Sequence, residues 1–149
     1  YMVTTLDIFE VRELVELRRE LEGYAGYLAA RRITTEQLED LRTIIREAES
    51  ETAETKDVSN ITEYFDTRFH SLLYQATGNQ KLVKILQDLH IVMLRIWFHV
   101  GFGAIGFIHQ AQNFYKVFEA LAQKEPENAR TAMEDHVDIY AAQIKEKFL

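Results

Sequence analysis

The sequence predicts an all-α fold, an antiparallel bundle of about six helices in a single domain. Apolar residues recur at spacings of three and four along most of the chain, which is the period of an amphipathic helix. No segment alternates apolar and polar residues as a half-buried strand does. The chain has 149 residues, of which 47% are hydrophobic. A chain of this size and composition can bury one continuous core without disulfides.

Two helices are predicted in the first third of the chain. Residues 14–32 carry one stripe of apolar positions, which consists of Leu14, Leu17, Leu21, Ala25 and Leu28. Charged residues 18–20 lie off this stripe. The second helix is expected to follow Thr34, because Thr34 and Gln37 have the spacing of a capping box. Its apolar positions keep the helical period at Leu38, Leu41, Ile45 and Ala48.

A polar connection over residues 49–59 separates these helices from the third. Asn60 is the expected N-cap of the third helix, since Glu63 follows it by three residues. The apolar positions of this helix are Phe65, Phe69, Leu72 and Ala76. Gly78 is the expected stop, because glycine adopts the left-handed conformation that ends many helices.

The fourth helix is predicted over residues 80–100, with Asn79 as its cap. Between residues 91 and 98 it is apolar on nearly all sides, which is typical of a central helix. Three of the six glycines lie within residues 101–106, so the segment 101–107 is expected to break the helix.

Two further helices complete the predicted bundle. The fifth is built on the apolar stripe Phe114, Val117, Phe118 and Leu121. Pro126 is expected in the first turn of the last helix, where its missing N–H has no intrahelical partner to lose. The predicted inner face of the last helix consists of Ala129, Ala132, Met133, His136 and Ile139.

Composition and charge exclude several classes of function. The formal charge of -7 argues against a direct grip on nucleic acid phosphates, so any DNA contact is expected from another domain. The absence of cysteine excludes disulfides and thiolate metal sites, which suits a cytoplasmic protein. The longest apolar run, residues 91–102, is too short for a membrane span and contains Arg95 and His99.

Three residues are candidate metal ligands. Asp66 and His70 are four residues apart on the third predicted helix, so their side chains point the same way. His136 lies on the predicted inner face of the last helix, where an unpaired imidazole would be costly. The alternative is an ordinary Asp–His hydrogen bond and a separate core histidine.

Arg95 is a candidate ligand-binding residue because it lies within the most apolar helix. A buried guanidinium needs an anion, so Arg95 is expected to face a ligand carboxylate, an acidic side chain or the surface. Its planar fork can hold a carboxylate through two hydrogen bonds. His99 follows one turn later on the same side.

Three segments carry patterns of a known family. Residues 16–41 contain E-x-R-x-x-L-E, residues 65–82 contain D-x-x-x-H-x-x-L before a small residue and Gly-Asn, and residues 119–136 contain A-L…A…A-M-x-x-H. In order and spacing they resemble the C-terminal effector-binding (FCD-type) domain of the FadR subfamily of GntR-type bacterial transcription regulators. The resemblance covers nearly the whole chain.

This resemblance implies a homodimer of helical bundles, each with an internal ligand cavity. It also implies a divalent metal, held by an Asp and three His, beneath a small carboxylate effector. Asp66 and His70 match the first two ligands and His136 matches the last. The remaining histidine belongs 22 residues before the last, where this chain has Phe114. The flanking Asn113 and Tyr115 are expected to point elsewhere.

The departure at Phe114 leaves three readings open. Asp66, His70 and His136 can hold Zn or Ni facially, with open positions for water or an effector. His99 or His109 can supply the missing ligand. In the third reading the metal is lost and Phe114 narrows a cavity for an acyl chain, as in metal-free members of the family. The predicted effector contacts are Arg95, His99, Phe114 and Tyr115.

The predicted function is ligand sensing and dimerisation by residues 1–149, without enzymatic activity. The resemblance implies that DNA is bound by an N-terminal winged helix-turn-helix domain, which is not present in this chain. Effector binding is expected to favour one arrangement of the dimer. The first helix, around residues 9–21, is expected to relay this change to the DNA-binding domain. The main alternative is a helical-bundle metalloenzyme with a two-His, one-carboxylate centre, although no general base or nucleophile motif accompanies the triad. A purely structural dimerisation bundle is a second alternative.

Overall fold

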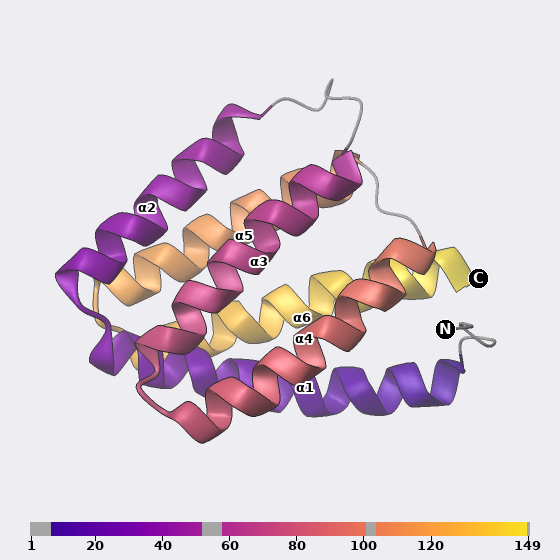
Figure 1. Cartoon of the computed structure of the whole chain (residues 1–149), viewed down its shortest axis with the longest axis horizontal. Helices are drawn as coiled ribbons and strands as arrows, with labels where there is room; N and C mark the ends of the chain where they lie inside the picture. The colour runs from indigo at the N-terminus through magenta and orange to yellow at the C-terminus, as the bar shows by residue number, and fades with distance from the viewer. Residues whose placement is uncertain (1–6, 52–57, 101–103, 149) are drawn as a thin grey trace.

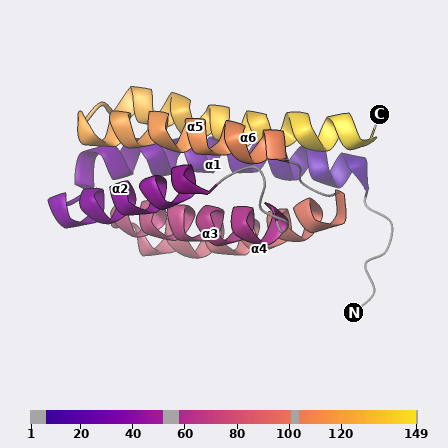
Figure 2. The same ribbon diagram turned by 90° about the horizontal axis from the view of Figure 1, so that it is seen from above.

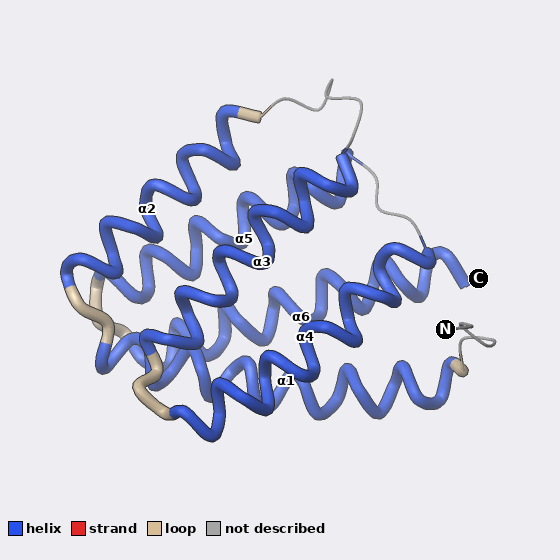
Figure 3. Tube along the Cα trace, viewed as in Figure 1, coloured by secondary structure: helices blue, strands red, loops and turns tan. Residues whose placement is uncertain are grey.

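The computed structural model describes residues 7–51, 58–100 and 104–148, and within these ranges it contains six α-helices and no strand. The all-α prediction is therefore confirmed (Figures 1 and 3). The helices are α1 (Ile8–Arg32), α2 (Thr35–Ser50), α3 (Val58–Ala76), α4 (Gln80–Val100), α5 (Ala104–Ala122) and α6 (Pro126–Phe148).

Local signals define most helix ends as predicted. The capping box of α2 is present, because Thr34 Oγ1 accepts from the Gln37 N–H at 3.1 Å and Gln37 Oε1 accepts from the Thr34 N–H at 3.0 Å. Asn79 caps α4 by accepting from the Leu82 N–H at 3.1 Å. Gly78 has a φ of 65°, which explains why glycine ends the preceding helix.

Helix α1 begins at Ile8, ahead of the apolar stripe that starts at Leu14 and close to the Phe9 start expected for the first helix, because Asp7 Oδ1 caps it through the Phe9 N–H at 2.9 Å. Two predicted boundaries were wrong. Helix α3 begins at Val58, so Asn60 lies inside it rather than at its cap. Helix α5 begins at Ala104, so the predicted break extends too far, and its residues 101–103 lie outside the described residues.

The helices pack in layers, with α1 at the centre of the bundle. In Figure 2, α5 and α6 form the upper layer, α3 and α4 form the lower one, and α1 runs between them. The packing agrees, since α1 contacts α3, α4, α5 and α6. Helix α2 packs on α3 and α5. This arrangement brings one face each of α1, α3, α4 and α6 to a common interior.

Helices α1 and α6 run side by side in both views and pack against each other extensively (Figures 1 and 2). It depends on Gly26. A Cβ atom at this position would lie 2.6 Å from the Ala129 carbonyl oxygen and 2.9 Å from Met133 Cγ. Only a residue without a side chain allows the two backbones to lie this close.

The apolar core is divided into three clusters. Phe69 belongs to the largest, Met93 to the second and Tyr74 to the third. Polar side chains are buried where these clusters meet. His70 is an example, since its ring contacts Phe69 of the largest cluster and Tyr74 of the third. No helix in the described ranges is long and apolar enough to cross a membrane.

Burial corrects the predicted inner stripes at several positions. Leu17 of the α1 stripe is 50% exposed, whereas Arg18, which was expected to lie off that stripe, is 2% exposed. On α6, Ile139 is partly exposed, while Val137 and Tyr140 are buried. The buried polar residue on α1 is the more consequential difference, because it needs a partner inside the bundle.

Candidate metal centre

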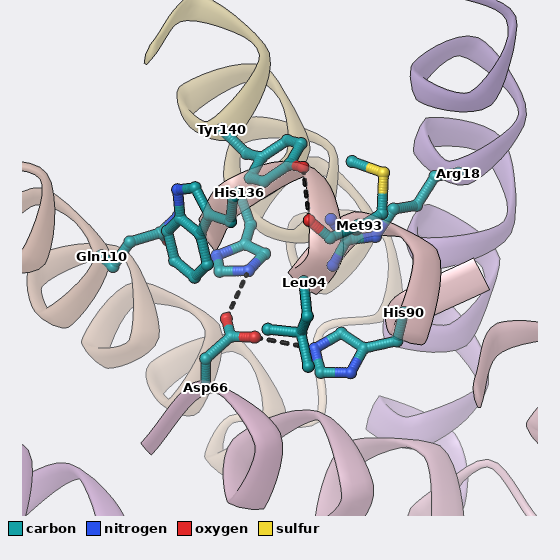
Figure 4. A pocket seen from close by; sticks show the side chains of 9 residues that line it. Arg18, Asp66, His90, Met93, Leu94, Gln110, His136 and Tyr140 are labelled. Carbon is teal, nitrogen blue, oxygen red and sulfur yellow. Dashed lines mark hydrogen bonds and ion pairs between the residues drawn. The ribbon is translucent and has the colours of Figure 1, made fainter. Parts of the chain in front are cut away.

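The carboxylate of Asp66 lies at the centre of a cluster of buried histidines. Its Oδ2 is 2.7 Å from His90 Nε2 (Figure 4). Its Oδ1 is 3.4 Å from His70 Nδ1 and 3.7 Å from His136 Nε2. All four side chains are buried, the most accessible being His90 at 7%. The structure therefore brings the three predicted candidates, Asp66, His70 and His136, into one interior cluster.

Sequence reasoning missed His90, which comes from α4. A signal for it exists in the sequence, because His90 shares a stripe with buried residues at helical spacing, namely Leu86, Met93 and Trp97. A histidine on a buried stripe needs a polar partner inside the fold. For His90 that partner is Asp66.

Asn113 corrects a second expectation, since it points inward rather than away. It is 3% exposed, and its Oδ1 lies 2.8 Å from His136 Nδ1. The Asn113 Nδ2 donates to the Ala132 carbonyl oxygen at 3.0 Å, which fixes Oδ1 as the acceptor. His136 therefore carries its hydrogen on Nδ1 and turns the lone pair of Nε2 toward Asp66.

His70 is held between its own helix and a buried arginine. Its Nδ1 lies 2.8 Å from the Asp66 carbonyl oxygen, and Arg18 Nη2 lies 3.3 Å from its Nε2. Because a guanidinium only donates, Nε2 is the acceptor and Nδ1 carries the hydrogen. Arg18 thus donates a hydrogen bond to His70 Nε2, the ring nitrogen that carries no hydrogen.

Arg18 also forms a buried ion pair, although helical periodicity predicts that charged residues 18–20 lie off the buried stripe. Its Nε donates to Glu22 Oε1 at 3.3 Å, and the side chains of both residues are almost fully buried. The Tyr74 hydroxyl donates a hydrogen bond to the same carboxylate. Both charged residues belong to the E-x-R-x-x-L-E pattern, so the pattern itself was the signal for this site.

Electrostatics keep the acidic groups of the cluster ionised. Burial alone would raise the pKa of Asp66, but the surrounding histidines, His70 first, hold that pKa well below its usual range. Burial of Glu22 is likewise outweighed, by His70 and Arg18, so its pKa is also lowered. Burial lowers the pKa of His70 to about 3, so this imidazole is neutral at pH 7.

Phe114 lies beside the cluster but contributes no donor atom. Its ring stacks on that of Phe69, with 4.0 Å between the ring centroids, and its centroid lies 5.4 Å from that of the His136 ring. The other predicted effector contacts are exposed and do not line the cavity described below: Arg95, His99 and Tyr115. On α4 the buried stripe contains His90, Met93 and Trp97, so Arg95 and His99 lie on the outer side of the helix. Their role in effector binding stays a prediction.

A small cavity of about 10 Å³ adjoins the Asp66 carboxylate. This is close to the space that a single water molecule requires. Gln110 lines the cavity, is 2% exposed and has no hydrogen-bond partner for either amide atom among the described residues. The complete lining is Arg18, Asp66, His90, Met93, Leu94, Trp97, Gln110, His136 and Tyr140 (Figure 4).

The cluster has the chemistry of a transition-metal site. Imidazole nitrogens and a carboxylate oxygen are the donors that Zn²⁺ and Ni²⁺ accept. The donor atoms of Asp66, His70 and His90 all lie within 4.8 Å of one another. Hydrogen bonds from neighbouring groups orient two of the rings, as is usual around bound metals.

Comparisons with known proteins agree with this architecture. The family model described as FCD domain matches residues 13–139. The solved structure of E. coli McbR/YncC aligns with 99% of this chain and 70% of its own, at a TM-score of 0.83 and 16% identity. Streptococcus agalactiae GntR aligns with 85% of this chain, at a TM-score of 0.63 and 25% identity, and this alignment spans 56% of that protein. A search of curated proteins finds no match.

Proposed function

The chain belongs to the FCD domain family of GntR-type regulators, and from this premise we propose that it senses a small carboxylate effector. In this proposal it is a regulatory domain of the FadR subfamily, acts in the cytoplasm and has no enzymatic activity of its own. A winged helix-turn-helix domain N-terminal to it binds DNA. The effector alters that binding by favouring one of two dimer arrangements, for which it must have different affinities.

The charges of the interior cluster carry the proposal. Metal ligation requires neutral histidines, and among the residues whose burial is described the remaining buried charges are then those of Arg18, Glu22 and Asp66. Together they leave one net negative charge. A divalent cation reverses this to one net positive charge, and a monocarboxylate then restores neutrality inside the bundle. An acyl chain without a charged head group would not do so.

A divalent metal, Zn or Ni, fits this interior. Asp66 and the surrounding histidines would hold it, and the bound ion would supply a Lewis-acid site for effector oxygens. Ligation by His70 through Nε2 requires that Arg18 release this nitrogen. The guanidinium is then available to pair with the effector carboxylate, as its two-pronged geometry favours. Arg18 thus takes the role that the sequence analysis gave to Arg95.

Thermal melting of the whole chain tests carboxylate sensing. We expect acetate or propionate to raise the melting temperature of the Zn²⁺-loaded protein. At one hundred times Kd a ligand stabilises by about 2.7 kcal/mol, which corresponds to roughly 5–10 °C for a chain of this size. Acetamide and propionamide are the matched controls, because they have the same shape without the charge. Equal shifts with acids and amides, or no shift with any acid, would contradict the proposal.

The proposed homodimer is supported by apolar side chains exposed on α1 and α4. These helices pack against each other, and large exposed apolar surface marks interaction sites. The exposed residues on the two helices include Leu17, Tyr24, Ile85, Val92 and Phe98. Leu17 and Tyr24 are seven residues apart, as are Ile85 and Val92, so each pair lies on one side of its helix. A second copy of this chain can cover this surface symmetrically.

Sedimentation equilibrium tests the dimer. We expect a mass of twice 17.4 kDa for the wild-type chain. The double substitution Leu17→Glu and Ile85→Glu should give the mass of a single chain, because it places charges in the interface. Tyr64→Glu is the matched control, since Tyr64 is 55% exposed on α3, beside Arg68, which pairs with Glu47 of α2. A monomeric wild type, or a double variant that stays dimeric, would refute the interface.

A further inference from the structure

We propose that His90 replaces the metal ligand that Phe114 cannot supply. The full ligand set is then Asp66, His70, His90 and His136. This inference deepens the proposed function and rests on it, because it concerns the same interior site. It differs from the set predicted from the sequence, which contained only two histidines.

The separations between donor atoms favour a shared ion. Two atoms that are each about 2.0–2.2 Å from one tetrahedral zinc ion lie roughly 3.3–3.6 Å apart. The distances from the Asp66 carboxylate are 2.7 Å to His90 Nε2 and 3.7 Å to His136 Nε2. They bracket the required spacing, so adjustments of less than about 1 Å would bring these two nitrogens into place. His70 would bind through Nε2, the nitrogen that accepts from Arg18, so it joins the ion only when Arg18 releases it.

The other histidines suggested as substitutes are unsuitable. His99 and His109 are both exposed, whereas His90 is 7% exposed and already touches the carboxylate. Position 114 carries a phenyl ring stacked on Phe69. The aromatic pair fills the space beside His136 on the α5 side of the cluster. The fourth ligand therefore comes from α4, on the opposite side of Asp66.

The hydrogen bonds of the cluster prepare His136 for this ligand set, whereas those of His70 and His90 must rearrange. Asn113 already presents the Nε2 lone pair of His136 to the interior. His90 Nε2 lies 2.7 Å from Asp66 Oδ2 and donates its hydrogen to that oxygen. On metal binding this hydrogen must leave Nε2, and a neutral imidazole then carries it on Nδ1. Both the carboxylate oxygen and the ring nitrogen become free to bind the cation.

Metal titration of the full chain tests this ligand set. We expect the wild type to bind one Zn²⁺ in calorimetry and to give the visible absorption of four-coordinate Co²⁺. His90→Asn should lower Zn²⁺ affinity by at least about 100-fold, because even groups that only orient a ligand contribute about 10–100-fold. Asparagine can still donate to Asp66, so circular dichroism should show a folded variant. His109→Ala, which removes an exposed histidine, should bind as the wild type does.

A rescue variant makes the assignment specific. Phe114→His in the His90→Asn background restores a third histidine beside His136, and we expect it to recover most of the lost affinity. Unchanged Zn²⁺ affinity in His90→Asn, or loss of affinity in His109→Ala, would overturn the role of His90 while leaving the sensor proposal intact. A wild type that takes up neither Zn²⁺ nor Co²⁺ would overturn the metal centre itself. Carboxylate-dependent melting without metal would then show that sensing survives alone.

Discussion

Replacing Arg18 with leucine is expected to lower the free energy of unfolding by about 3–5 kcal/mol, as measured by urea denaturation. Arg18 is 2% exposed and pairs with Glu22, which is completely buried. Of the donors in the described part of the chain, removing the cation leaves the buried Glu22 carboxylate with the Tyr74 hydroxyl alone. A buried charge that loses its partner is among the most destabilising changes known for single substitutions.

Two variants show whether burial is the cause. Arg19→Leu removes the adjacent arginine, which pairs with Glu134 and Asp138 at the surface, and should change stability by about 1 kcal/mol or less. The triple variant Arg18→Leu, Glu22→Leu and Tyr74→Phe removes the buried ion pair together with the hydroxyl that donates to it, leaves only His70 Nε2 without its donor, and should recover most of the stability. Equal effects of Arg18→Leu and Arg19→Leu would show that the buried pair does not stabilise the fold.

Gly26→Ala is expected to destabilise the bundle by about 3 kcal/mol or more, although alanine is the better helix former. The added Cβ would lie 2.6 Å from the Ala129 carbonyl oxygen, and a backbone atom cannot rotate away. Relief requires that α1 and α6 separate along their contact. The midpoint of urea denaturation measures this loss directly.

Gly23→Ala is the matched control for the same substitution on the same helix. Its Cβ would meet the side chains of Glu134 at 3.1 Å and Arg130 at 3.3 Å. These side chains can shift, so the change should stay within about 1 kcal/mol of the wild type, the size of the helix-propensity gain. If the two alanine variants are equally stable, the α1–α6 contact is looser than the 2.6 Å spacing at Gly26 implies.

Sequence periodicity predicted the helical architecture because each helix buries one apolar stripe. It was least reliable on α1, where Arg18 is buried and Leu17 is 50% exposed. The usual expectation that charges face water fails there, because Glu22 and His70 supply partners from within the bundle. Such partners depend on how helices are placed next to one another, which spacing along one helix does not specify.

The candidate site was predictable only in part for the same reason. Asp66 and His70 share a helical face through their four-residue spacing, and His136 was assigned through its place on the last helix and a family resemblance. His90 and Asn113 belong to helices that meet this face only in the folded bundle. Asn113 lies next to Phe114 in sequence, yet both are buried, because that face of α5 is wide enough for two adjacent positions.

The missing side chain at Gly26 has a mechanical consequence. Two helices packed this closely resist sliding and separation, so we expect α1 and α6 to move together. This pair carries Arg18 and His136, whereas Asp66 and His70 lie on α3 and His90 lies on α4. A helix movement that draws these side chains around a guest is therefore expected in α3 or α4 rather than in α1 and α6. Since Ile85 and Val92 are exposed on α4, a tilt of α4 would reshape the surface offered to a neighbouring copy.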